Sequence, residues 1–203
     1  MKPGQAQYSR RRWVVTTFAP VLLATVASSD TPASQWHFEK VTTATLESFA
    51  WKTNESRLAT AFVFLSTDCP IANSYAPELR RIQSTYALRG VQFWAVYCDP
   101  AETAESLRRH QEQYQLTMPW LRDQQQELAR ALQVSRTPEV AVLDSHGNRI
   151  YRGRIDDRHL RLGQSRLEAT THEFRDALEA TLGGRPIPVA ETVAVGCHLP
   201  PLP

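Results

Sequence analysis

One cysteine of this chain, Cys69, has neighbours that favour covalent chemistry. The uninterrupted apolar run at residues 61–65 predicts a strand buried on both faces. Pro70 follows the cysteine, and proline is favoured in the first turn of a helix because its missing N–H would be unpaired there. Free N–H groups and partial positive charge at a helix N-terminus stabilise the thiolate, the reactive form of cysteine. We therefore predict that Cys69 is a nucleophile; the alternative is a small buried apolar residue.

The elements around Cys69 predict two neighbouring parallel strands. A helix is expected over residues 72–86, with Gly90 as the cap that ends it, and residues 91–96 form the next apolar strand. A strand–helix–strand connection is right-handed and brings the carboxyl ends of both strands to one edge of the sheet. Cys98 follows the second strand, so we expect it at the same edge as Cys69, though not necessarily within reach of it.

The rest of the chain completes an α/β pattern. A parallel pair together with a later antiparallel hairpin predicts a central mixed β-sheet flanked by helices. Further helices are expected over residues 101–116, 124–132 and 168–182, and further strands or extended pieces over 37–41, 48–51, 119–121, 134–143 and 148–152.

The turn Ser66-Thr67-Asp68-Cys69-Pro70 resembles the active site of the thioredoxin superfamily. It is most similar to the redoxin branch, of the alkyl hydroperoxide reductase and thiol-specific antioxidant (AhpC/TSA) type. In that family a Ser or Thr three residues before the reactive Cys hydrogen-bonds the peroxide, and Ser66 occupies that place. Phe62 replaces the family's usual Pro, and Ala72 stands where thioredoxins have a second Cys. The resemblance implies a thioredoxin-like fold and thiol oxidoreductase activity, with Thr67 and Pro70 as part of the site.

A second part of the resemblance is Thr137-Pro138, which is similar to the cis-proline loop of thioredoxin folds. In the family that proline faces the catalytic cysteine and substrate backbone pairs beside it. An X-Pro bond costs only about 0.5–1 kcal/mol to be cis, so the feature is feasible here. The alternative is a trans-proline at the start of an edge strand. The resemblance therefore implies that Thr137, Pro138 and the neighbouring Arg136 bind substrate.

The C-terminal segment, residues 185–203, is rich in proline and carries Gly196-Cys197. Related redoxin-like proteins have a similar Val-Gly-Cys ending, which implies a role tied to the site. Cys197 is thus the first candidate for the resolving partner of Cys69, and Cys98 is the second. The pairing itself stays open at this point, because three cysteines permit three different pairs.

Residues 1–27 have the features of an export signal: Arg10 to Arg12, an apolar run too short for a typical membrane span, and small residues after it. The segment also resembles a twin-arginine signal. We expect a bacterial protein exported to the periplasm or beyond the cytoplasm; an uncleaved N-terminal anchor is the alternative. A linker with N-terminal strands (28–58), the redoxin domain (59–184) and the tail (185–203) would follow.

The formal net charge of +2 arises from this segment, whose four basic residues have no acidic counterpart. The mature chain would be slightly acidic, which gives no electrostatic reason to expect nucleic-acid binding. An arginine-rich stretch at residues 149–166 could be an anion or partner surface, although a salt-bridged loop is the favoured interpretation.

The leading hypothesis is an exported, antioxidant or thiol–disulfide exchange enzyme without metal or cofactor. Cys69 would attack a peroxide oxygen or a protein disulfide, a second thiol would resolve the product, and Ser66, Thr67 and Arg136 are the available donors. A thioredoxin-like or membrane-borne protein would supply electrons. The sequence does not indicate the oligomeric state.

Two alternatives come from other classes. Cys69, Cys197 and His198 could hold a soft metal such as copper(I), in a copper- or haem-assembly module. The turn is similar to that of Sco-type copper chaperones, but Asn73 stands where those proteins have their second Cys. The other alternative is a catalytically silent domain in which a Cys69–Cys197 disulfide is structural.

Overall fold

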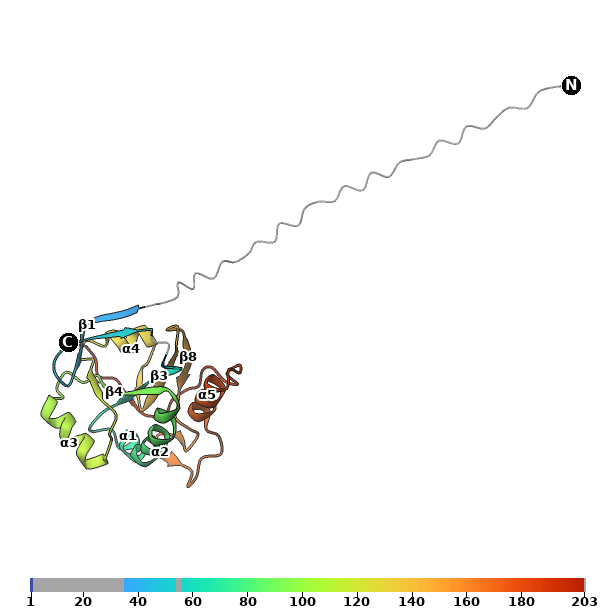
Figure 1. Ribbon diagram of the computed structural model, residues 1–203. Coiled ribbons are helices and arrows are strands. Elements are labelled where there is room, and N and C mark those ends of the chain that lie inside the picture. Colours follow the sequence, from blue (N-terminus) through green and yellow to red (C-terminus); the bar gives the residue numbers. More distant parts are fainter. Residues whose placement is uncertain (2–34, 54–55, 203) are drawn as a thin grey trace. The chain divides into compact units, whose positions relative to one another are not determined.

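A computed structural model describes residues 35–53 and 56–202, together with Met1 (Figure 1). The predicted export signal, apart from Met1, and residues 28–34, 54 and 55 of the predicted linker region lie outside the described residues. The unit described below falls within Pro32–Pro203. Within the described ranges, no helix is long and apolar enough to cross a membrane.

The fold is built on one seven-stranded mixed sheet in the order β2-β1-β5-β4-β3-β7-β8. β3 is an inner strand that pairs in parallel with β4 and antiparallel with β7. All of its residues are buried, which confirms the strand predicted from the apolar run. The strands are β1 (Gln35–Thr43), β2 (Ser48–Lys52), β3 (Ala59–Leu65), β4 (Val91–Tyr97), β5 (Trp120–Arg122), β7 (Glu139–Asp144) and β8 (Arg149–Gly153).

Helices cover both faces of the sheet (Figure 1). Alternate residues of β3 point to opposite faces. Val63 belongs to the apolar cluster that also includes Leu79 of α2 and Phe174 of α5, whereas Phe62 packs with Leu128 of α4 and the aromatic side chains of the N-terminal hairpin. The helices are α1 (Pro70–Ser74), α2 (Ala76–Tyr86), α3 (Ala104–Tyr114), α4 (Glu127–Leu132) and α5 (Glu173–Leu182), with a 3₁₀ turn η1 (Ala87–Arg89).

The N-terminal hairpin β1–β2 is part of the central sheet, because β1 also pairs with β5. Its buried side chains reach the centre of the molecule. Trp51 donates a hydrogen bond from Nε1 to Thr60 Oγ1 of β3 at 2.9 Å, and Phe49 meets the rings of Phe62 and Trp94 edge-on. The two predicted strands are confirmed, and they extend the core of the domain.

Three predicted helices begin later than their sequence patterns suggested, and one of them is α4, which was expected from residue 124 and begins at Glu127. The helix expected from residue 101 begins at Ala104, after Thr103, whose side chain and that of Ser106 cap each other's backbone N–H groups. Glu102 falls inside the predicted helix range but precedes α3 and is buried. The last helix begins at Glu173, because residues 168–172 form an extended segment with bends.

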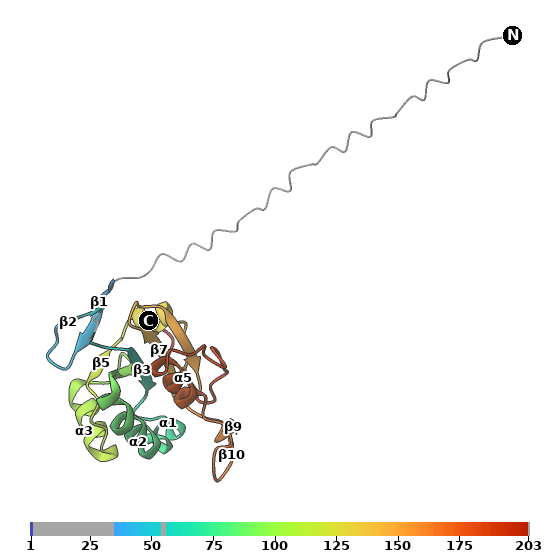
Figure 2. The same cartoon turned by 45° about the vertical axis from the view of Figure 1, so that its right-hand side comes forward.

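The C-terminal tail is ordered and runs against the sheet. Arg152 of β8 donates its N–H to Ala190 O and accepts from Thr192 N, both at 3.0 Å. Further on, β11 (Cys197–His198) pairs with β6 (Arg136–Thr137), the short strand that precedes β7. These strand contacts of the tail were not predicted. Figure 2 shows a separate small hairpin, β9 (His159–Arg161) with β10 (Gln164–Ser165), extending away from the body of the domain.

If the hairpin is part of the core, its buried hydrogen bond must contribute to global stability. We expect Trp51→Phe to lower the free energy of unfolding by about 1–3 kcal/mol, because Thr60 Oγ1 would be left buried without its donor. Trp94→Phe is the matched control, since the Nε1 of Trp94 is buried without a partner among the described residues. Urea unfolding of both variants tests this; equal losses would contradict it.

Candidate active site at the Cys69 turn

Cys69 lies where the sequence predicts it, between the end of β3 and the start of α1. It is the N-cap residue of α1, its Sγ accepts from Ala72 N at 3.5 Å, and Pro70 occupies the first turn. The backbone N–H of Cys69 donates to Ser66 O at 3.4 Å, which closes the turn before the helix. Only 1 % of the residue is exposed.

The Thr137–Pro138 peptide bond is cis, as predicted, and the alternative of a trans-proline is wrong. The loop comes directly against the cysteine: Cys69 Sγ lies 3.1 Å from Thr137 O. Pro138 is buried. The Cys69 turn and the Thr137–Pro138 loop, almost 70 residues apart in sequence, therefore lie against each other in one site.

Cys197 is brought to this loop by strand pairing. In the β6–β11 ladder Cys197 lies opposite Thr137, and His198 lies opposite Arg136. Because Cys69 Sγ lies 3.1 Å from Thr137 O, Cys197 is close enough for its thiol and backbone N–H to lower the pKa of Cys69. Both cysteines are free thiols. The structure thus places together Cys69, Thr137, Pro138 and Cys197, four of the residues that the sequence predicts for the site.

The surroundings of the two thiols move their pKa values in opposite directions. Burial opposes ionisation of Cys69, but hydrogen bonds from the Cys197 thiol and from the N–H groups of Ala72 and Cys197 outweigh it, so the Cys69 pKa lies below its ordinary value. Burial, its hydrogen bond to Cys69 and the negative charge there raise the pKa of Cys197. Cys69 is thus the thiol that ionises first, and Cys197 keeps its proton.

Cys98 occupies a different environment. Its Sγ lies 3.9 Å from Asp123 Oδ2, and it packs in the apolar cluster of Phe62 and Leu121, whereas Cys69 belongs to the other cluster. Burial, followed by the negative charges of Asp123 and Glu102, raises its pKa well above the ordinary value. Although both cysteines follow parallel strands, the described residues show no contact between Cys98 and Cys69.

The three predicted donors differ in what they can offer. The Thr67 hydroxyl donates to Asp68 Oδ1 at 3.4 Å and its N–H to Glu102 Oε1 at 2.8 Å. Arg136 faces the opposite side of β6 from Thr137, because successive side chains of a strand alternate. Ser66 lines a cavity of about 110 Å³ beside the site, together with Cys98, Thr137 and residues 198–200.

Thr137 carries a hydroxyl that the sequence did not single out as a donor. Its Oγ1 is buried and has no hydrogen-bond partner among the described residues. It is nevertheless close enough to Cys69 to lower the pKa of that thiol as a donor to the thiolate. This hydroxyl is therefore a donor that becomes useful only when Cys69 or a bound oxidant presents an acceptor.

A buried polar chain behind the turn was missed by sequence reasoning. Asn73 donates from Nδ2 to Thr67 O at 2.9 Å and faces His110 Nε2 with its Oδ1 at 2.8 Å; His110 Nδ1 lies 2.9 Å from the Tyr97 hydroxyl. Desolvation by burial lowers the pKa of His110, so the ring is neutral at pH 7. The chain links α1, α3 and β4 and holds the Thr67–Cys69 turn in place.

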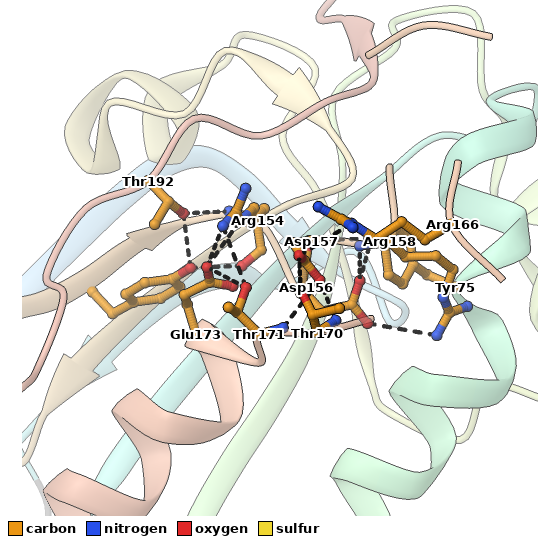
Figure 3. Close-up of polar contacts among 11 residues, drawn as sticks. Tyr75, Arg154, Asp156, Asp157, Arg158, Arg166, Thr170, Thr171, Glu173 and Thr192 are labelled. Carbon is orange, nitrogen blue, oxygen red and sulfur yellow. Dashed lines mark hydrogen bonds and ion pairs between the residues drawn. The ribbon is translucent and has the colours of Figure 1, made fainter. Parts of the chain in front are cut away.

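The arginine-rich stretch supports the turn from the other end of α1 (Figure 3). Tyr75, which separates α1 from α2, donates from its hydroxyl to Asp156 Oδ1 at 2.6 Å. Arg158 pairs with Asp156 at 3.5 Å and stacks over the Tyr75 ring. The helix predicted over residues 72–86 is thus divided at Tyr75, with Pro77 in the first turn of α2.

The neighbouring carboxylates in Figure 3 are also paired. Burial opposes ionisation of Asp157, but donors from Thr170 and Thr171 and the charge of Arg166 lower its pKa to about 2. Arg154 pairs with Glu173 at the start of α5. The favoured interpretation of this stretch as a salt-bridged loop is confirmed for Arg149, Arg152, Arg154, Arg158 and Arg166.

Comparison with known proteins identifies the family. The sequence model of the Redoxin family matches residues 24–169, most of the chain. The chain belongs to the redoxin family. A thioredoxin-like redox function follows at the level of the family, and the Cys69 turn and the cis-proline loop fall inside the matched range. The tail with Cys197 falls outside it. A search of curated proteins finds no match.

Solved structures agree on the fold. An uncharacterized conserved protein from Geobacillus kaustophilus is 26% identical with a TM-score of 0.70, covering 82% of this chain and 89% of that one. A hypothetical protein from Sinorhizobium meliloti has 24% identity and a TM-score of 0.70, with coverage of 83% and 92%. A thiol:disulfide interchange protein from Chlorobium tepidum has 20% identity and a TM-score of 0.52, with coverage of 75% and 97%. These likenesses show that the redoxin has a thioredoxin-like fold.

The effect of Cys197 on the pKa of Cys69 can be tested by titration. We expect Cys197→Ala to raise the pKa of Cys69, because the thiolate loses a donor, while Cys197→Ser keeps a hydroxyl donor and should raise it less. The measurement is the thiolate absorbance of the reduced variants at 240 nm as a function of pH. An unchanged Cys69 pKa in Cys197→Ala would show that the tail does not stabilise the thiolate.

Proposed function

We propose that this redoxin is a two-cysteine thiol oxidoreductase in which Cys69 is the nucleophile and Cys197 the resolving thiol. The observation that carries the proposal is that both cysteines lie against one residue: Cys69 Sγ lies 3.1 Å from Thr137 O, and Cys197 lies opposite Thr137 in the β6–β11 ladder. A resolving thiol must reach the sulfur of the nucleophile after it has reacted, and Cys197 already lies beside it. Cys98 is separated from Cys69 by its place in the other apolar cluster.

Two first steps are compatible with this site. With a peroxide, the Cys69 thiolate attacks one oxygen, the O–O bond breaks, and the products are a sulfenic acid and a hydroxide or alkoxide that takes a proton. With a disulfide, the thiolate attacks one sulfur, a mixed disulfide forms, and the second sulfur leaves as a thiolate. Each route oxidises Cys69 and reduces the substrate by two electrons.

The second step is the same in both routes. Cys197 loses its proton and attacks Cys69 Sγ, which forms the Cys69–Cys197 disulfide and releases water or a second thiol. The raised pKa of Cys197 fits this order, because a protonated Cys197 first serves as donor to the Cys69 thiolate. Once Cys69 has been consumed, the negative charge that opposed ionisation of Cys197 is gone.

An external thiol must then reduce the disulfide, and Cys197 is the sulfur it would attack. Cys197 is partly exposed, whereas Cys69 is buried. The electron donor would be a thioredoxin-like or membrane-borne protein outside the cytoplasm, in keeping with the predicted export of the chain. Export is likewise part of the proposal.

The alternative of a soft-metal site has less support. In the described part of the chain, no three His, Cys, Asp or Glu side chains lie close enough together to hold a metal ion. His198 pairs with Arg136 and follows Cys197 on a strand, where side chains alternate. Cys69 and Cys197 alone would supply only two ligands to a metal ion.

The test follows thiol loss and disulfide formation in the reduced protein after one equivalent of hydrogen peroxide or of a small disulfide. We expect a bond between Cys69 and Cys197, mapped by mass spectrometry. Cys69→Ser should lower the rate by at least about 10³-fold, because the nucleophile is absent. Cys197→Ser should leave Cys69 as a sulfenic acid or mixed disulfide.

Cys98→Ser is the comparison variant: Cys98 lines the cavity beside the site but shows no contact with Cys69 among the described residues, so this variant should still form the Cys69–Cys197 disulfide. A bond between Cys69 and Cys98 would refute the assigned resolving thiol. Thiol loss no faster than that of free cysteine with either oxidant, or a Cys69–Cys197 bond inert to dithiol reductants, would favour a structural disulfide.

A further inference from the structure

The tail occupies the backbone edge beside the cis-proline. β11 pairs antiparallel with β6, and after it Leu199 donates its N–H to Ser135 O at 3.1 Å. Residues 135–137 thus form a short ladder with residues 197–199. The sequence analysis expected substrate backbone to pair beside Thr137 and Pro138, but in this structure the chain's own C-terminal segment is paired there.

The approach of the tail to the loop requires a glycine. A Cβ on Gly196 would overlap the carbonyl of Thr137, at 2.6 Å from its carbon, and would lie 3.0 Å from Pro138 Cδ. Real side chains do not come this close to backbone, and Gly196 is not in the left-handed region. Glycine is therefore needed at position 196 because a side chain there would clash with the Thr137 carbonyl, and not because of its backbone conformation.

The tail is also fastened on both sides of the Cys197 strand. Upstream, a Cβ on Gly153 would overlap Thr192, so a second glycine allows close approach, and Ala194 is buried. Downstream, Gln126 at the start of α4 donates from Nε2 to Pro200 O at 2.6 Å. The tail around Cys197 is thus an integral part of the domain.

An edge whose N–H and C=O groups are already paired cannot accept another strand. A polypeptide disulfide that needs backbone pairing next to the cis-proline is therefore excluded while the tail is docked. The cavity of about 110 Å³ beside Thr137 has room for only a few molecules of water size. Its lining includes Ser66 and the hydroxyl of Thr137, which has no hydrogen-bond partner in the part of the chain that the structure describes.

We propose that residues 196–199 are an internal occupant of the polypeptide-binding edge and restrict the Cys69 site to small oxidants. The inference rests on the proposed function of Cys69 and adds a substrate class to it. The tail then has two roles: it supplies the resolving thiol, and it prevents pairing with the backbone of a protein substrate.

The test compares two oxidants, hydrogen peroxide and the disulfides of insulin, in single turnover with the reduced protein. The readout is the rate of Cys69 loss. Gly196→Ala should displace the tail from Thr137 and raise the insulin rate relative to the peroxide rate by about tenfold, the effect of removing roughly one net backbone hydrogen bond that competes with substrate. Using the ratio cancels any change in the Cys69 pKa.

Gly184→Ala is the control for replacing a glycine: its added Cβ meets no atom within 4 Å, and the strain from its left-handed backbone (φ +60°) arises outside residues 196–199, so it should keep the wild-type ratio. Gln126→Ala removes a single tail contact at a helix end and provides a milder second variant; it should shift the ratio in the same direction, by about two- to threefold.

The inference is overturned if the wild-type protein consumes insulin disulfides as fast as hydrogen peroxide, or if both tail variants keep the wild-type ratio. A different result bears on the proposed function. If Cys69 reacts with neither oxidant faster than free cysteine, in the wild type and in the variants alike, the proposed function fails and this inference fails with it.

Discussion

A thiolate that is almost completely buried requires donors in place of the water it has lost. Cys69 is 1 % exposed, and burial alone would keep it protonated. The start of α1 contributes the N–H of Ala72, and the tail contributes the N–H and S–H of Cys197. Neither segment alone provides all of these donors, so stabilisation of the Cys69 thiolate involves two segments that lie 125 residues apart.

The need to bring donors to the buried Cys69 thiolate accounts for several features of the surrounding structure. Gly196 lets the tail backbone reach the Thr137 carbonyl, and Gly153 lets it pass Thr192 close to β8. The Asn73–His110–Tyr97 chain holds the turn from behind, and Tyr75 with Asp156 fixes the far end of α1. Because these groups are buried and paired, they restrain the sulfur of Cys69 to a narrow range of positions.

The sequence predicted well those parts that depend on local patterns. The apolar run of β3, Pro70 at the start of α1 and the Thr137–Pro138 loop each have a local signal, and the structure confirms all three. The details that depend on tertiary packing were not predictable. Glu102 and His110 lie in a polar stretch, and only the packing of α3 shows that they are buried. The strand in the proline-rich tail was not predicted, because pairing of β11 with β6 has no local signature in the sequence.

The position of the second thiol has a consequence for control of the site. In a Cys-x-x-Cys motif both sulfurs belong to one helix turn, whereas in this redoxin Ala72 takes the place of the second Cys and Cys197 arrives with the tail. A state in which the tail leaves the loop exposes the backbone edge beside Pro138. The same state loses the donors of Cys197, so the pKa of Cys69 rises and less of it is thiolate. If Cys69 is the nucleophile, as proposed, access for large substrates and nucleophilic strength oppose each other, and the docked tail favours the buried thiolate over access.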